Sequence, residues 1–251
     1  MILFPAIDLI AGQVVRLERG DRSRMKVYSD DPAAVAAQFA ADGAAWVHVV
    51  DLSATFGEDE DARAANDRAI REICRLGTIS VDVGGGVRSL ERLEELADMG
   101  CKRISMGTAL VRDPELARHA ATSFCDVVVA DVAARDGQVR VNGWRDGEGI
   151  DAIELVSSLA DMGFRHLVFT DIARDGMQSG IDVDAYRTIA RAAGFAPVAS
   201  GGIATLDDLK ELAQAGTDVV EGAITGRALY EGAFTLTDAL AVAHGGDLDA
   251  H

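Results

Sequence analysis

The chain has 251 residues, 49% of them hydrophobic and 26% charged, and this is the size and composition of an ordinary globular domain with one sizeable core. Its formal charge of −17 argues against a nucleic-acid backbone or an anionic membrane surface as partner, because like charges repel. Three cysteines without a CxxC spacing, no basic leader after Met1 and no apolar run of about 18 residues predict a cytoplasmic protein without disulfides, a zinc site or a membrane span.

Apolar runs rich in β-branched residues alternate along the chain with stretches of helical periodicity, which is typical of parallel strands joined by helices. The expected strands are Ile2–Ile7, Trp46–Val50, Ile79–Val83, Arg103–Met106, Asp126–Ala130, His166–Thr170, Pro197–Ser200 and Val219–Ala223. The helical stretches include Pro32–Asp42, Leu90–Met99, Pro114–Ala121, Ile150–Met162 and Leu206–Ala215. Eight such units predict a single (β/α)8 TIM barrel domain over residues 1–251, with a doubly wound sheet as the alternative.

The sequence also repeats itself over about half its length, which predicts two half-barrels at about residues 1–123 and 124–245. Asp8 recurs as Asp131, and Asp51 as Asp171, each time after an apolar run. The glycine clusters recur as well, Gly84-Gly85-Gly86 as Gly201-Gly202 and Gly107-Thr108 as Gly226-Arg227. A doubly wound sheet gives no reason for such a repeat.

Asp8 and Asp131 are the candidate catalytic residues. Strands one and five face each other across a closed eight-stranded barrel, so the two carboxylates are expected on opposite walls of one cavity. Taken alone, either aspartate is as well explained by capping a backbone N–H, but the symmetric pair favours catalysis. Two opposed carboxylates suit a reaction in which one takes a proton from carbon and the other protonates a heteroatom. One of them must then stay neutral near pH 7, which needs a pKa about three units above the ordinary ~3.9.

The glycine clusters are the candidate phosphate sites. Gly84, Gly85 and Gly86, like Ser200, Gly201 and Gly202, let the backbone approach an anion, while Gly107-Thr108 and Gly226-Arg227 open short helices whose N–H groups bind one. Glycine clusters also form ordinary turns, but strands seven and eight are where this barrel commonly holds phosphate. The repeat predicts a second site opposite, and hence a ligand with a phosphate at each end.

Further candidates lie in the loops. Thr170 and Asp171 end strand six, where a hydroxyl can hold a carboxylate or sugar oxygen, or where both can simply cap a helix. Trp144 is expected to stack on a planar heterocycle or to act as a packing lid. Arg16 and Arg19 are expected to reach a phosphate or to lie in a solvated hairpin. No metal cluster can be assembled from the histidines, and His48 is interpreted as a hydrogen-bonded core residue.

Several segments together resemble the phosphoribosylformimino-aminoimidazole-carboxamide ribotide isomerases of histidine biosynthesis. They are Phe4-Pro5-Ala6-Ile7-Asp8-Leu9, Val83-Gly84-Gly85-Gly86-Val87-Arg88, Thr170-Asp171-Ile172-Ala173-Arg174-Asp175-Gly176, Ser200-Gly201-Gly202-Ile203 and Gly222-Ala223-Ile224-Thr225-Gly226-Arg227-Ala228-Leu229. The resemblance implies a cofactor-free Amadori rearrangement of a bisphosphorylated ribonucleotide. It implies that Asp8 is the general base and Asp131 the general acid. Thr170, Asp171 and Asp175 would support the acid and the substrate, and Gly176 would bind the substrate. The protein is expected to be a monomer.

Three alternatives remain. A dual-substrate branch that also isomerises phosphoribosyl anthranilate typically has serine in place of Gly84 and arginine in place of Asn142, and this chain has neither. The cyclase subunit of imidazole glycerol phosphate synthase normally carries a lysine in the first loop, where this chain offers Arg16 and Arg19. A barrel that binds sugar phosphates without turnover is disfavoured by the intact aspartate pair.

Overall fold

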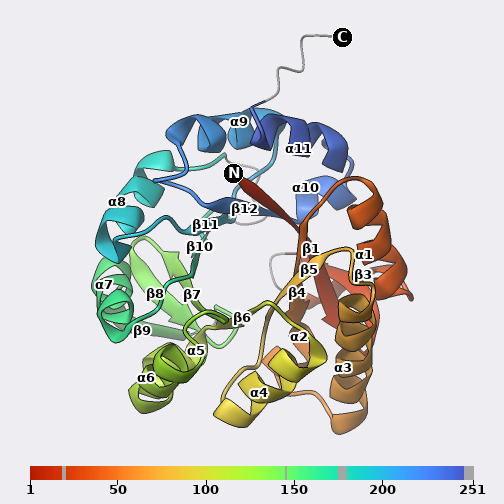
Figure 1. Ribbon diagram of the computed structural model, residues 1–251, viewed down its shortest axis with the longest axis horizontal. Helices are drawn as coiled ribbons and strands as arrows, with labels where there is room; N and C mark the ends of the chain where they lie inside the picture. The colour runs from red at the N-terminus through yellow and green to blue at the C-terminus, as the bar shows by residue number, and fades with distance from the viewer. Residues whose placement is uncertain (19–20, 145, 175–179, 246–251) are drawn as a thin grey trace.

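The structure is a computed structural model that describes residues 1–18, 21–144, 146–174 and 180–245. Its centre is a closed barrel of eight parallel strands (Figure 1), which close on themselves because β12 pairs with β1 and β7 with β10. The barrel strands are β1 (Ile2–Ile10), β4 (Trp46–Asp51), β5 (Ser80–Gly84), β6 (Arg103–Met106), β7 (Val128–Arg135), β10 (Leu167–Asp171), β11 (Val198–Ser200) and β12 (Gly222–Thr225). The predicted TIM barrel is confirmed, and the doubly wound sheet, which is open, is wrong.

Helices surround the barrel on its outside (Figure 1). They are α1 (Pro32–Ala41), α2 (Leu52–Phe56), α3 (Glu60–Arg75), α4 (Leu90–Met99), α5 (Thr108–Arg112), α6 (Pro114–Ser123), α7 (Ala152–Met162), α8 (Val183–Ala193), α9 (Leu206–Ala215), α10 (Arg227–Tyr230) and α11 (Leu236–Ala243). The predicted bounds of α4 and α9 match those of the structure. Within the described residues, none of these helices combines the length and the apolar character needed to cross a bilayer.

Side chains alternate between the two faces of each barrel strand, and this alternation decides what reaches the cavity. Ile7 and Leu9 of β1 are fully buried in the large core under the helices, whereas Phe4 and Ala6 belong to a smaller apolar cluster inside the barrel. The other buried members of that inner cluster are Val129, Val168, Val198 and Ile224. Asp8 continues the inward series of Phe4 and Ala6, so its side chain emerges at the mouth of the barrel.

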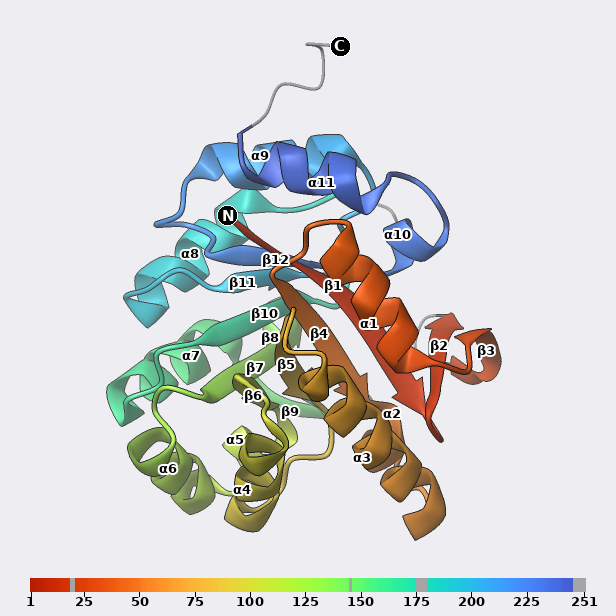
Figure 2. The ribbon, with the colours of Figure 1, turned by 45° about the vertical axis from the view of Figure 1, so that its right-hand side comes forward.

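Two strands continue beyond the barrel into hairpins, one in each half. β1 turns back into β2 (Gln13–Glu18) and β3 (Asp21–Ser29), which project beside the barrel in Figure 2, and β7 turns back into β8 (Gln138–Val141) and β9 (Asp146–Asp151). The predicted strand ends at Ile7 and Ala130, directly before Asp8 and Asp131, were therefore wrong. Antiparallel pairing with β2 and β8 extends β1 and β7 beyond both residues, and the longer strands are themselves part of the half-barrel repeat.

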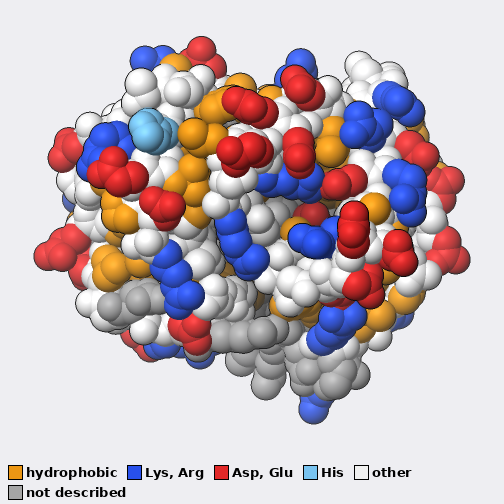
Figure 3. Space-filling model, turned by 90° about the horizontal axis from the view of Figure 1, so that it is seen from below, with side chains coloured by type: hydrophobic (Ala, Val, Ile, Leu, Met, Phe, Trp, Pro, Cys, Tyr) orange, Lys and Arg blue, Asp and Glu red, His pale blue; other side chains and the backbone are white. Residues whose placement is uncertain are grey.

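Acidic residues outnumber basic ones in the chain, 41 to 24. On the face of the molecule seen in Figure 3, the described Asp and Glu side chains are interspersed among Lys and Arg side chains. On that face, therefore, the negative charge is spread out rather than gathered in one patch.

Candidate active site

A cavity of about 300 Å³ opens at the C-terminal ends of the barrel strands, which is where TIM barrels carry their chemistry. Its size lies at the lower end of the range for small-molecule sites. The predicted site residues that line it are Asp8, Arg16, Gly84, Gly85, Gly86, Gly107, Thr108, Asp131, Trp144, Thr170, Ser200, Gly201, Gly202, Gly226 and Arg227. Asp171 does not line it. Arg19, Asp175 and Gly176 lie outside the described residues.

Asp8 is paired with a cation. The β2 strand returns alongside β1 and brings the Arg16 guanidinium to 2.8 Å from the Asp8 carboxylate, with 22% and 15% of the two side chains exposed. The same guanidinium lies against Gly226, where an added Cβ would be 2.8 Å from both of its terminal nitrogens. Hydrogen bonds between a guanidinium and a carboxylate are charge-assisted and fix the orientation of both groups. Arg16 therefore connects Asp8 to the glycine-rich segment after β12.

Asp131 has a different environment. Within the described part of the chain, no hydrogen bond or ion pair to its carboxylate is seen. Burial raises the pKa of Asp131 to about 6; the charge of His48 opposes this rise and that of Asp82 adds to it. The two aspartates that the sequence makes equivalent are thus electrostatically unequal. Asp8 has a guanidinium beside it, whereas burial moves Asp131 toward the protonated state that an acid needs, with a pKa rise of about two rather than the expected three.

His48 lines the cavity between these two aspartates in the barrel wall. Its Nδ1 lies 2.7 Å from Asp82 Oδ2, and the Ser105 hydroxyl donates to the other oxygen of Asp82 at 3.3 Å. Burial lowers the pKa of His48, but the attraction and hydrogen bond of Asp82, together with the charges of Asp131 and Asp8, outweigh it, so that the pKa is raised. The hydrogen bond predicted for this ring is present. Its exposure to the cavity was missed, although His48 stands opposite Ala6 in the register of β1 and β4.

The side chains of Asp51 and Asp171, the second pair of the repeat, do not line the cavity. Thr170 continues the inward series of Val168 and lines the cavity, so the next residue, Asp171, faces the other way. Its carboxylate accepts from the Ala173 N–H at 3.0 Å and lies 3.3 Å from Arg174 Nε. Asp171 therefore holds the start of the loop after β10.

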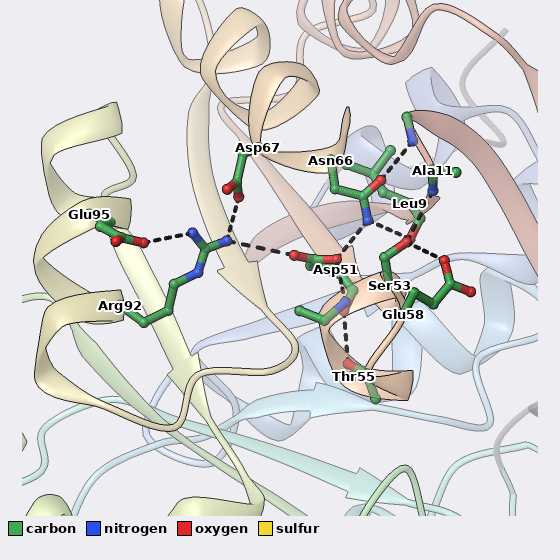
Figure 4. A network of polar contacts seen from close by, with 12 residues as sticks. Leu9, Ala11, Asp51, Ser53, Thr55, Glu58, Asn66, Asp67, Arg92 and Glu95 are labelled. Atoms are coloured by element: carbon green, nitrogen blue, oxygen red, sulfur yellow. Dashed lines mark hydrogen bonds and ion pairs between the residues drawn. The ribbon is translucent and has the colours of Figure 1, made fainter. Parts of the chain in front are cut away.

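Asp51 is the centre of a buried polar network (Figure 4). Its Oδ1 accepts from the Ala54 N–H, which caps α2, and from the Asn66 side chain of α3 at 2.6 Å. Its Oδ2 lies 3.6 Å from the Arg92 guanidinium of α4, which also binds Asp67 at 2.5 Å. Burial is the main cause of the raised pKa of Asp51. The network ties β4, α2, α3 and α4 into one unit.

This unit supports the first glycine cluster. Gly85 and Gly86 have φ of +102° and +69°, in the left-handed region. A Cβ on Gly85 would collide with the Asp51 carbonyl oxygen, and one on Gly86 with Ala54. Glycine is therefore required at both positions for two reasons, the left-handed backbone conformation and the close approach of the backbone to α2.

The short helices α5 and α10 begin alike. Their N-cap residues are Gly107, with φ −114° and ψ −90°, and Gly226, with φ −123° and ψ −85°, and neither helix has a side-chain cap. The other helices of the described chain are each capped by an Asp, Ser or Thr side chain. Both uncapped helix starts line the cavity. The N–H groups at these helix starts can bind two anions at separate points of its rim.

The hairpin after β7 carries Asn142 and Trp144 and adds Arg140, which sequence reasoning did not single out. Asn142 and Trp144 adopt left-handed φ of +55° and +69°, and the Asn142 N–H donates to Thr108 Oγ1 at 3.0 Å. Arg140 lines the cavity, and its buried Nε has no hydrogen-bond partner within the described residues. Knowing that β8 pairs with β7 would have placed Arg140 opposite Ala133, which also lines the cavity.

Comparison with known proteins places the chain in a family. Residues 2–235 match the family model described as histidine biosynthesis protein. A protein of Rhodopseudomonas palustris strain BisA53 is 43% identical over 96% of this chain and 97% of its own length, one of Rhizorhabdus wittichii 42% over 98% and 99%, and one of Moorella thermoacetica 43% over 98% and 100%. All three are named 1-(5-phosphoribosyl)-5-((5-phosphoribosylamino)methylideneamino)imidazole-4-carboxamide isomerase. The chain belongs to the histidine biosynthesis protein family.

Proposed function

We propose that this protein is an aldose–ketose isomerase that performs the Amadori rearrangement of the imidazole-carboxamide ribonucleotide for which its relatives are named. The observation that carries the proposal is the unequal pair of aspartates in one cavity, Asp8 paired with Arg16 and Asp131 with a pKa of about 6. The names of the relatives support the isomerase over the cyclase, and the aspartate pair argues for catalysis over binding alone.

The reaction divides between the two carboxyl groups. Asp131 donates its proton to the ring oxygen of the aminoaldose as the bond from that oxygen to C1 breaks, which leaves a protonated imine. Asp8 then takes the proton from C2, and the electrons of that bond neutralise the imine to give an enaminol. Return of a proton to C1 and loss of the C2 hydroxyl proton give the aminoketose. No atoms are gained or lost, and each proton moves to or from a group of suitable charge.

The two glycine-rich segments and their uncapped helices would hold the two phosphates. Gly85, Gly86 and the start of α5 form one proposed site, and Gly202 and the start of α10 form the other. Trp144 would pack against the planar heterocycle, and Thr170 would position the acid or the substrate. We further propose that the protein is a cytoplasmic monomer and that it acts on a small molecule rather than on a nucleic acid or a membrane.

The purified protein, without added metal or nucleotide, should convert the formimino ribotide to its ketose, followed by the change in absorbance or by chromatography. Asp8→Asn and Asp131→Asn should each lower kcat by roughly 10²- to 10⁴-fold, because each removes one proton-transfer group. Phosphoribosyl anthranilate is the matched second substrate. Turnover of neither compound, or full activity of either variant, would disprove the assignment.

A further inference from the structure

Two of the three cysteines meet at the end of the barrel away from the cavity. Cys74 lies in the last turn of α3, and Cys101 directly follows Gly100, the residue at which α4 ends. Because both helices run back toward the N-terminal ends of the strands, this contact lies opposite the catalytic face. The two Sγ atoms are 3.8 Å apart, although the residues are 27 positions apart in the chain.

The two thiols differ in accessibility and in charge. Cys101 is buried, with 5% exposed, while Cys74 is partly exposed. The hydrogen bond with Cys101 lowers the pKa of the Cys74 thiol; burial opposes this, and the positive charges of Lys102 and Arg71 add to it. The same hydrogen bond and burial raise the pKa of Cys101. Cys74 is therefore the accessible nucleophile, and Cys101 is the protonated neighbour held in contact with it.

We propose that Cys74 and Cys101 form an oxidisable thiol pair, which peroxides convert to a disulfide that thiols reduce again. The Cys74 thiolate attacks one oxygen of hydrogen peroxide, the O–O bond breaks, and a sulfenic acid and, after protonation, one water are formed. Cys101 sulfur then attacks Cys74 sulfur and displaces the hydroxyl group, which leaves as a second water with the Cys101 proton. Two thiols and one peroxide thus give one disulfide and two waters.

The disulfide would join the end of α3 to the residue before Lys102 and β6. The residues between them form β5, α4 and their connections, so the crosslink closes a loop of 27 residues. Neither cysteine lines the cavity, and the crosslink would act on stability alone. Cys125, in the turn before β7, has no thiol contact within the described residues and is the internal control.

The test is peroxide titration of the whole protein, followed by alkylation of the remaining thiols and peptide mass analysis. We expect a peptide pair linked through Cys74 and Cys101, alkylated Cys125, and recovery of all three thiols with dithiothreitol. A sulfinic acid on Cys74 with Cys101 still alkylated would overturn the proposal, and so would a crosslink through Cys125.

Variants separate the two steps. In Cys101→Ser the sulfenic acid of Cys74 cannot be resolved, so dimedone should label it, whereas the Cys125→Ser control should form the disulfide as the parent does. Oxidation should raise the thermal midpoint of the parent by on the order of 10 °C, and should leave that of Cys101→Ser unchanged. Equal dimedone labelling of the parent and of Cys101→Ser would refute the proposed thiol pair. So would an unchanged thermal midpoint of the parent after crosslinking. None of these readouts depends on isomerase activity.

Discussion

Replacing Asp131 by asparagine should make the folded protein more stable at neutral pH while it removes the acid. The folded-state pKa of about 6 exceeds the unfolded value of 3.8, so the folded protein retains this proton over that range. The contribution of Asp131 to the free energy of unfolding is therefore most favourable at pH values below its unfolded-state pKa. It falls as the pH rises through the folded-state pKa. A difference of about two between the folded-state and unfolded-state pKa corresponds to about 3 kcal/mol of unfolding free energy. The asparagine variant avoids this loss of stability because asparagine is never charged.

Urea unfolding of both proteins at pH 8 and at pH 5 measures this effect. The stability advantage of Asp131→Asn should be about 3 kcal/mol at pH 8 and roughly half as large at pH 5, where the folded parent is mostly protonated. Asp8→Asn is the matched control: it should show no such gain, because it leaves Arg16 without its carboxylate at 2.8 Å. An Asp131→Asn protein no more stable than the parent at pH 8, or an advantage independent of pH, would refute the reasoning.

Three other changes test separate parts of the structure. Trp144→Ala should raise KM about 3- to 10-fold, the value of one aromatic contact, and initial-rate measurements should find kcat nearly unchanged. Gly202→Ala should raise KM at least about 10-fold, because its Cβ would lie 2.5 Å from the Gly180 carbonyl oxygen. Gly77→Ala is the control: Gly77 is also at positive φ, but an added Cβ would have no atom within 4 Å. This variant should lose only about 1 kcal/mol of stability and keep its KM. Asp51→Ala should lose about 3 kcal/mol in urea unfolding, and the more exposed Asp171→Ala markedly less; equal losses would contradict the role given to the network of Figure 4.

The fold was accessible from the sequence because its signals are local and repeated. Alternating strand and helix patterns and the return of Asp8 as Asp131 were enough to predict the barrel, although the half-barrel limits near residue 123 stay a prediction. The last strand was misplaced: Val219 and Val220 are buried, but β12 runs from Gly222 to Thr225. Hydrophobicity marks burial, and burial is not restricted to strands.

The site was harder to predict, since it depends on direction and on pairing across strands. Thr170 and Asp171 are neighbours, yet only the first faces the cavity, and the period of two from Val168 would have distinguished them. Arg140 reaches the cavity through a hairpin that carries no strong turn signal beyond Asp136-Gly137. The difference between Asp8 and Asp131 arises from Arg16 on one side and burial on the other, and no spacing in the sequence encodes it.

Arg16 contacts both Asp8 and the glycine at which α10 begins, so an anion at that helix would share its guanidinium with the base. Binding of an anion at the start of α10 would therefore change the charge environment of the base that acts on the reacting carbon. A substrate fragment without that terminal phosphate should then be processed slowly even at saturating concentration, so that turnover falls along with affinity.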